Sequence, residues 1–201
     1  FKALTSADLA NTTADWNTRH GEISLPKSFQ PSLLSQTAVG NSANDILIEG
    51  SYAYVADGTS GLKIYDITDP ENLSLVGSYD TTNNNYLALT KTGSYVIIAD
   101  SSSDDAVDMV IVNVSNPASP SLTKTMTDGD AAGSPIDVAV SGTTLFALLD
   151  IHPSSAPVER IWSYDITDIN NPAPLGDVEV SQSGNLETRG LQIVGNRLYP
   201  G

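Results

Sequence analysis

A strand–turn–strand pattern that recurs three times constrains the fold of this chain more than any other feature. In each copy an apolar strand, a tight turn containing glycine and a second apolar strand lead to an aspartate, and the copies occupy 45–57, 87–100 and 137–150. Glycine reaches positive φ without steric cost, so each turn predicts a β-hairpin. A third strand and a Pro-bearing turn follow each hairpin, and the repeated letters YDITD at 65–69 and 164–168 mark the same place in two copies.

The period of the repeat is near fifty residues and predicts a sheet of about four strands. Asp66, Asn113 and Asp165 hold equivalent places, 47 and 52 residues apart. One such antiparallel meander cannot cover both of its apolar faces, but several arranged around an axis can, and four strands per repeat is the blade of a β-propeller. The predicted fold class is all-β, a β-propeller of four-stranded antiparallel blades with only about half a ring present. A stack of β-helix coils is the alternative, although such coils have shorter periods and lack paired hairpins.

The first complete unit also resembles a known repeat family. The stretch DILIEGSYAYVADGTSGLKIYDITDPENLSLVGSYDT at 45–81 is similar to the LVIVD repeat, and 85–126 and 135–180 follow it more loosely, with longer connections. A further unit begins at 189–201. The resemblance implies a β-propeller of a kind usually found in secreted or surface-attached bacterial and archaeal proteins, often within a longer chain. It brings no catalytic motif.

The repeat divides the chain into an N-terminal segment outside the repeat and a partial propeller. The predicted boundaries are 1–29 and 30–201, and the second range holds the end of one blade at 30–43, blades at 44–84, 85–133 and 134–184, and the start of another at 185–201. Known propellers have roughly four to eight blades. Because an open sheet edge leaves backbone groups unpaired, we expect a missing segment or another chain to complete the ring.

Composition excludes several classes of function. Nine Lys and Arg stand against 24 Asp and Glu, a formal net charge of −15, so the basic surface that binds phosphates is missing and we expect no nucleic-acid partner. No run approaches the roughly 18 apolar residues of a membrane span. The absence of cysteine excludes disulfides and thiolate sites, and the two histidines, His20 and His152, have no metal-ligand spacing.

Two sets of carboxylates recur at repeat positions. Asp57, Asp100 and Asp150 close the second strands, where they are expected either to cap turns by accepting backbone hydrogen bonds or to serve a site. Asp45 and Asp137 begin innermost strands, where the structural alternative is a bond to a neighbouring blade. Asp45, Asp137, Asp57 and Asp150 are therefore the candidates for polar groups on the channel face.

One loop could bind calcium. The run DSSSDDAVD at 100–108 places Asp100, Asp104, Asp105 and Asp108 close together, and Ca²⁺ prefers clustered oxygen ligands. The spacing is not that of an EF-hand, and a solvated acidic loop is the alternative. No other cofactor is expected.

The sequence favours a non-enzymatic role. We expect an extracellular or cell-surface propeller that acts as a recognition or structural module, with a protein or a glycan at the cell surface as its partner. A glycan-active hydrolase or lyase with carboxylates at the central channel is one alternative. A self-associating filament or surface-layer subunit is another.

Overall fold

The structure, a computed structural model, describes residues 33–37, 40, 42–102, 109–127, 133–151, 158–182 and 190–200. The chain divides into two units, Phe1–Leu34 and Ser35–Gly201, and all the strands described below lie in the second. The predicted N-terminal segment, 1–29, lies outside the described residues.

The first sheet, blade 1, is a four-stranded antiparallel meander. Its strands are β1 (Asp45–Glu49), β2 (Tyr52–Ala56), β3 (Leu62–Asp66) and β4 (Ser74–Tyr79), and they lie in the sheet in chain order. The turn at Gly50, with a φ of 61°, joins β1 to β2 and confirms the predicted hairpin.

The second and third sheets repeat this order. Blade 2 contains β5 (Tyr86–Thr92), β6 (Tyr95–Asp100), β7 (Met109–Asn113) and β8 (Ser121–Met126). Blade 3 contains β9 (Gly133–Ser141), β10 (Thr144–Ile151), β11 (Val158–Asp165) and β12 (Ala173–Gln182). A further hairpin, β13 (Leu191–Val194) with β14 (Arg197–Pro200), forms a two-stranded sheet that we call blade 4.

The pairing registers show that the blades are the same unit. The register between the third and fourth strands shifts at one equivalent place in each complete blade, after Ile64, Ile111 and Ser163. A β-bulge increases the local twist of its strand, so a shared bulge gives the three outer strands the same bend. The registers also fix which residues are equivalent: Tyr54, Ile97 and Phe146 each pair with one of these three bulge residues.

The repeated YDITD residues begin the turn between the third and fourth strands. The Asp66 Oδ1 atom accepts hydrogen bonds from Thr68 N (2.8 Å) and Thr68 Oγ1 (2.6 Å), and Asp165 binds Thr167 in the same way. These bonds hold the pKa of the Asp66 carboxyl below its ordinary value. In blade 2, Asn113 Oδ1 accepts from Ser115 N (2.9 Å), which explains how Asn replaces Asp there.

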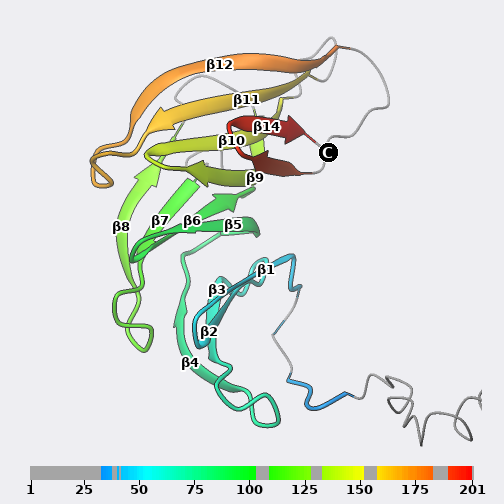
Figure 1. Cartoon of the computed structure of the whole chain (residues 1–201), viewed down its shortest axis with the longest axis vertical. Coiled ribbons are helices and arrows are strands. Elements are labelled where there is room, and N and C mark those ends of the chain that lie inside the picture. The colour runs from blue at the N-terminus through cyan, green and yellow to red at the C-terminus, as the bar shows by residue number, and fades with distance from the viewer. Residues whose placement is uncertain are drawn as a thin grey trace, which may run out of the picture. The chain divides into compact units, whose positions relative to one another are not determined.

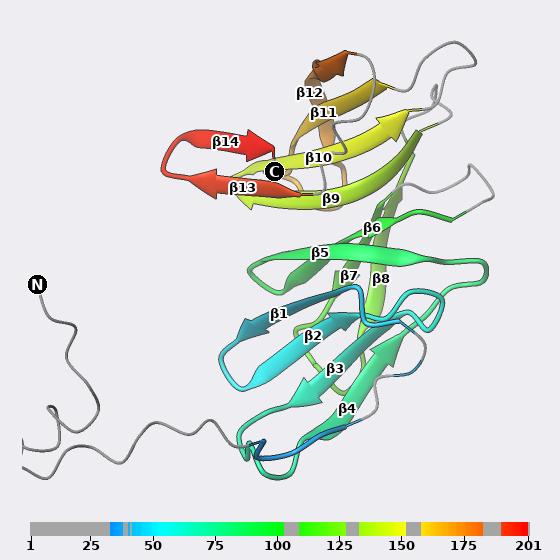
Figure 2. The ribbon, with the colours of Figure 1, turned by 90° about the vertical axis from the view of Figure 1, so that its right-hand side faces the viewer.

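Blades 1 and 2 each bury one face against the next blade. We call the face toward the following blade the front and the opposite face the back. The front of blade 1 and the back of blade 2 share one apolar cluster, and the front of blade 2 and the back of blade 3 share a second. Figure 1 shows the blades fanned one after another, and Figure 2 shows β1, β5, β9 and β13 succeeding each other along the inner side. The predicted partial propeller of four-stranded antiparallel blades is confirmed.

The segment 30–43, predicted as the end of a blade, is described only in part. Its described residues, 33–37, 40 and 42–43, lie in no strand. The segment nevertheless contacts blade 1, because Ser35 Oγ donates to Pro70 O (2.7 Å).

Candidate functional site

Two carboxylates on the inner strands join neighbouring blades. The Asp45 Oδ2 atom on β1 accepts a hydrogen bond of 2.9 Å from Leu89 N on β5. The Asp137 Oδ2 atom on β9 accepts one of 2.5 Å from Leu191 N on β13. The other oxygen of each carboxylate accepts from the next residue of its own strand, Ile46 N (2.8 Å) and Val138 N (2.7 Å). Both carboxylates therefore make the structural bond to a neighbouring blade.

These aspartates alternate with small residues around the axis. One position at the start of the innermost strand can be compared in all four blades. It holds Asp45 in blade 1, Ala88 in blade 2, Asp137 in blade 3 and Gly190 in blade 4. Each aspartate thus serves two amides, one in its own blade and one in the next, and the blade that follows needs no acid of its own. Sequence reasoning missed this alternation, although equivalent positions could have revealed it.

The Asp137 carboxyl has a perturbed acidity. Burial raises its pKa above the ordinary value, and the negative charge of Asp45 adds to the rise, while the hydrogen bonds from Leu191 and Val138 oppose it. A carboxyl whose pKa is raised by burial and by the charge of a second carboxylate is the pattern of a general acid. A structural role explains the raised pKa equally well, because the hydrogen bond from Leu191 places the Asp137 carboxyl between two blades.

The closing aspartates of blades 1 and 2 hold the chain that enters each blade. The Asp57 Oδ1 atom accepts from Ser42 N (3.0 Å), and the Asp100 Oδ1 atom accepts from Asn85 N (2.8 Å), in each case fifteen positions earlier. Both aspartates are buried. Asp150, predicted to share this position, lies one residue further along its strand: Leu149 pairs with Pro135 as Asp100 pairs with Tyr86.

The predicted calcium loop lies mostly outside the described residues. Asp104, Asp105 and Asp108 are among the residues not described, as are His20 and His152. Within the described part of the chain, no three or more acidic or histidine side chains gather where they could hold a metal ion.

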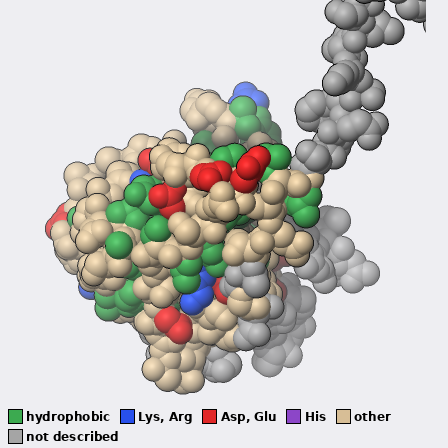
Figure 3. All heavy atoms as spheres, turned by 90° about the horizontal axis from the view of Figure 1, so that it is seen from below, with side chains coloured by type: hydrophobic (Ala, Val, Ile, Leu, Met, Phe, Trp, Pro, Cys, Tyr) green, Lys and Arg blue, Asp and Glu red, His purple; other side chains and the backbone are tan. Residues whose placement is uncertain are grey.

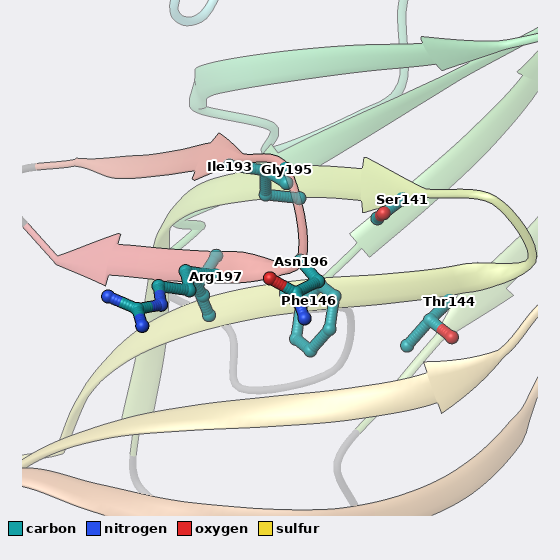
Figure 4. Close-up of a pocket in the computed structure, with 8 residues that line it drawn as sticks. Ser141, Thr144, Phe146, Ile193, Gly195, Asn196 and Arg197 are labelled. Atoms are coloured by element: carbon teal, nitrogen blue, oxygen red, sulfur yellow. The ribbon is translucent and has the colours of Figure 1, made fainter.

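A groove separates the front of blade 3 from blade 4 at the end where the β9–β10 and β13–β14 hairpins turn. Its volume is about 370 Å³. Figure 4 shows Asn196 beside the Phe146 ring, with Ser141 and Thr144 on the other side. The residues that line the groove are Ser141, Thr144, Phe146, Ile193, Gly195, Asn196, Arg197 and Leu198. It therefore combines apolar side chains with neutral polar groups and one cationic side chain, Arg197, and no carboxylate lines it.

The groove exists because small side chains occupy positions that are filled in the other blades. Thr144 stands where blades 1 and 2 have Tyr52 and Tyr95. At the interface of blades 1 and 2 the same region holds an ion pair of 2.9 Å between Lys91 and Glu49, with the Lys91 ammonium 5.8 Å from the centre of the Tyr54 ring. The sequence analysis did not single out Ser141 or Thr144. The signal that could have revealed the groove is the absence of a tyrosine at position 144, where the other complete blades have one.

Four-stranded sheets with shared registers, packed face to face around a line of inner strands, define the class of this protein as a partial β-propeller. Residues 40–81 and 91–128 match the LVIVD repeat. Blades 1 and 2 therefore carry LVIVD repeats, as the resemblance predicts.

Solved structures support the fold. The chain is similar to the computationally designed Ika4 protein, with a TM-score of 0.56 and 14% sequence identity over 86% of this chain and 92% of that chain. It is also similar to a europium-containing methanol dehydrogenase, with a TM-score of 0.51 and 11% identity over 70% of this chain and 25% of that chain. The second match spans only a quarter of the enzyme, so both likenesses concern the fold alone.

Curated protein sequences give no match to this chain. Among the residues described, no helix has the length and apolar character needed to cross a membrane.

Proposed function

We propose that the protein is a non-enzymatic extracellular β-propeller that acts as a recognition or structural module in a cell-surface or secreted assembly. The observation that carries this proposal is the use of the repeated carboxylates: Asp45 and Asp137 accept backbone hydrogen bonds from the next blade, and Asp57 and Asp100 accept them from the chain that enters blades 1 and 2. Proteins that carry the LVIVD repeat are typically secreted or attached to the surface, which supports the extracellular location.

The groove between blades 3 and 4 is the proposed recognition site, and a neutral sugar unit of a surface glycan is the proposed ligand. The Phe146 ring offers an apolar surface, and the side chains of Ser141, Thr144 and Asn196 offer hydrogen bonds to hydroxyl groups. A net charge of −15 disfavours anionic ligands although Arg197 lines the groove, and the lining has no acid for a cation.

A titration with neutral and uronic-acid disaccharides, followed through the backbone amide signals by NMR, tests this site. We expect the neutral sugars to shift the Gly195 and Asn196 signals. Thr144→Tyr should abolish the shifts, because tyrosine fills the equivalent position in blades 1 and 2. Ser94→Ala, at the equivalent hairpin of blade 2, is the matched control and should bind as the parent does. Shifts spread over other blades, or no shifts, would contradict the assignment.

A glycan-active hydrolase or lyase is a second candidate, and the raised pKa of Asp137 is the observation that favours it. The structural role of Asp137 is better supported than a catalytic one, because both of its carboxylate oxygens already accept backbone hydrogen bonds. Release of new reducing ends from a polysaccharide, lost in both Asp45→Asn and Asp137→Asn while the fold persists, would establish the enzyme.

Calcium binding by the loop at 100–108 is a separate proposal. Its support is the sequence of four aspartates, of which Asp100 already accepts the Asn85 amide through one oxygen. Calorimetric titration of the chelator-treated protein with calcium chloride tests it. Heat of binding that disappears in Asp104→Asn/Asp105→Asn would support the site, and the absence of heat and of any shift in Tm would contradict it.

A further inference from the structure

The turn between β3 and β4 of blade 1 carries an exposed asparagine with a hydroxyl side chain two residues later. Asn72 lies in the turn, and Ser74, also exposed, begins β4. Asparagine, any residue except proline, and then serine or threonine form the acceptor sequence for N-glycosylation on surface loops of secreted proteins. Asn72, Leu73 and Ser74 meet this requirement.

The turn reaches into solvent. It extends beyond the lower end of β4 in Figure 1. Figure 3 views the protein from that side and shows Asp and Glu side chains and uncharged surface among the hydrophobic side chains of this face. A bulky, hydrated group attached to Asn72 would therefore project away from the packed blades.

The corresponding turns of blades 2 and 3 have the same geometry. In each turn the backbone N–H of the fourth residue donates to the carbonyl of the first residue, at 3.0 Å in all three blades. The equivalent fourth residues are Asn72, Ser119 and Asn171. The residues that follow them are Leu73, Pro120 and Pro172.

Leu73 distinguishes the turn of blade 1 from the other two. In blade 3, Asn171 is followed by Pro172, and proline at this position prevents N-glycosylation. In blade 2, Ser119 offers no side-chain amide. Because the same turn accommodates proline in both of those blades, its shape does not require leucine in blade 1. Leucine there leaves Asn72 available as an acceptor.

The Asn72 side chain can be modified without loss of its hydrogen bond. Its Nδ2 atom donates to Asp69 Oδ2 at 2.8 Å. A side-chain amide carries two N–H donors, and N-glycosylation replaces only one of the two hydrogens. The remaining N–H can still donate to Asp69, so the turn keeps its internal bond after the sugar is attached.

A second copy of the acceptor sequence, at Asn113, lies in a different environment. Asn113 is half-buried at the end of β7, and its Oδ1 atom accepts from Ser115 N at 2.9 Å. Val114, between them, is 4% exposed, and its N–H donates to Ser94 O at 2.8 Å. Because the folded blade holds this stretch on both sides, we expect Asn113 to stay unmodified. A third copy, at Asn11, lies outside the described residues.

We propose that Asn72 is an N-glycosylation site that receives an oligosaccharide from a lipid-linked donor. In this transfer the Asn72 Nδ2 atom forms a bond to the anomeric carbon of the first sugar and loses one proton. The bond between that carbon and the phosphate oxygen of the donor breaks, and the lipid phosphate leaves with the electron pair. The site rests on the extracellular location proposed above, because N-glycosylation modifies secreted proteins.

Mass spectrometry of tryptic peptides from the protein isolated from its natural source tests the proposal. Cleavage after lysine places Asn72 on the peptide Ile64–Lys91 and Asn113 on the peptide Thr92–Lys124. We expect the mass of the first peptide to be raised by whole sugar units, with fragmentation placing the addition on Asn72. The second peptide should have the mass that its sequence gives.

Two variants made in the same source distinguish N-glycosylation from other additions. Leu73→Pro should abolish the added mass and leave the circular dichroism spectrum unchanged, because Pro120 and Pro172 occupy this position in the same turn. Ser74→Thr is the matched control and should retain the added mass, because threonine also completes the acceptor sequence.

Three results would overturn the proposal. An unmodified Ile64–Lys91 peptide from protein recovered outside the cell would exclude the site and leave the extracellular location intact. The same peptide from protein recovered only inside the cell would exclude the site and the location together. Added mass that persists in Leu73→Pro, or that is lost in Ser74→Thr, would show that the modification does not follow the acceptor sequence at Asn72.

Discussion

Asp45 on β1 and Leu89 on β5 are joined by a hydrogen bond of 2.9 Å between the carboxylate of one blade and the backbone amide of the next. Asp137 and Leu191 repeat the relationship two blades later. A half-buried carboxylate that accepts a backbone N–H takes the place of the water that this amide would otherwise bind. The innermost strands are therefore tied to each other by side chains as well as by apolar packing.

Replacing Asp45 should weaken the propeller. Asp45→Ala removes the acceptor for Leu89 N and Ile46 N, and we expect the free energy of unfolding to fall by about 1–3 kcal/mol. Urea unfolding measures the change. Asp80→Ala, at an exposed carboxylate, is the matched control and should change the free energy little. Equal stabilities of the two variants would contradict a bridging role for Asp45.

Two aspartates should respond to pH with opposite signs. The pKa of Asp137 is raised, mainly by burial, so the folded state holds its proton more tightly than the unfolded state does. Its contribution to stability is therefore present below the ordinary pKa and is lost as pH rises through the folded pKa. The pKa of Asp66 is lowered by Thr68, so its contribution is present above the ordinary pKa and is lost as pH falls through the folded pKa.

Unfolding of Asp137→Asn and Asp66→Asn in urea between acid and neutral pH measures this difference. The stability advantage of the parent over Asp137→Asn should shrink as pH rises, and its advantage over Asp66→Asn should grow. Parallel pH profiles for the two variants would show that the two carboxyls do not differ in environment.

Contact between outer parts of neighbouring blades depends on one glycine. A Cβ at Gly77 on β4 would collide with Pro117 O in the β7–β8 turn and would lie 3.2 Å from Pro120 Cδ. We expect Gly77→Ala to lower the free energy of unfolding by about 1–3 kcal/mol, because the turn must move away from β4. Ser78→Ala, at the next position on β4, is exposed and should be close to neutral. Equal midpoints of thermal unfolding would contradict the close approach of Pro117.

The sequence predicted the blades because the repeat determines local structure. Glycine in a hairpin turn, and an aspartate that accepts hydrogen bonds from the residue two positions later, as Asp66 does, act within a few residues. The sequence therefore indicates these hairpins and turns directly. The bond from Asp45 to Leu89 spans 44 residues and becomes visible only when equivalent positions of successive blades are compared. Sequence reasoning offered such a bond as an alternative but could not name its donor.

The groove was missed for a different physical reason. A hollow between blades depends on what is absent from both facing surfaces, whereas periodicity reports what is present on one strand. The small residues Ser141 and Thr144 therefore carried no motif that could indicate the groove.

Filling the groove should stabilise the protein. Thr144→Tyr places at this position the residue type found at Tyr52 and Tyr95, and it buries additional apolar area against blade 4. We expect a gain of about 1 kcal/mol in the free energy of unfolding, seen as a higher Tm. Thr143→Tyr, one residue earlier in the exposed turn, is the control and should leave Tm unchanged. A lower Tm for Thr144→Tyr would mean that the two hairpins lie too close for the ring.

A crystal structure of the chain tests the central claim most directly, namely that the blades are one unit repeated around an axis. We predict that the sheets at 45–79, 86–126 and 133–182 superpose on one another by rotation about a single axis. Leu89 N should lie within hydrogen-bonding distance of Asp45, and Leu191 N within that of Asp137. Sheets that superpose by translation along a line, or inner strands that do not neighbour each other, would contradict the claim.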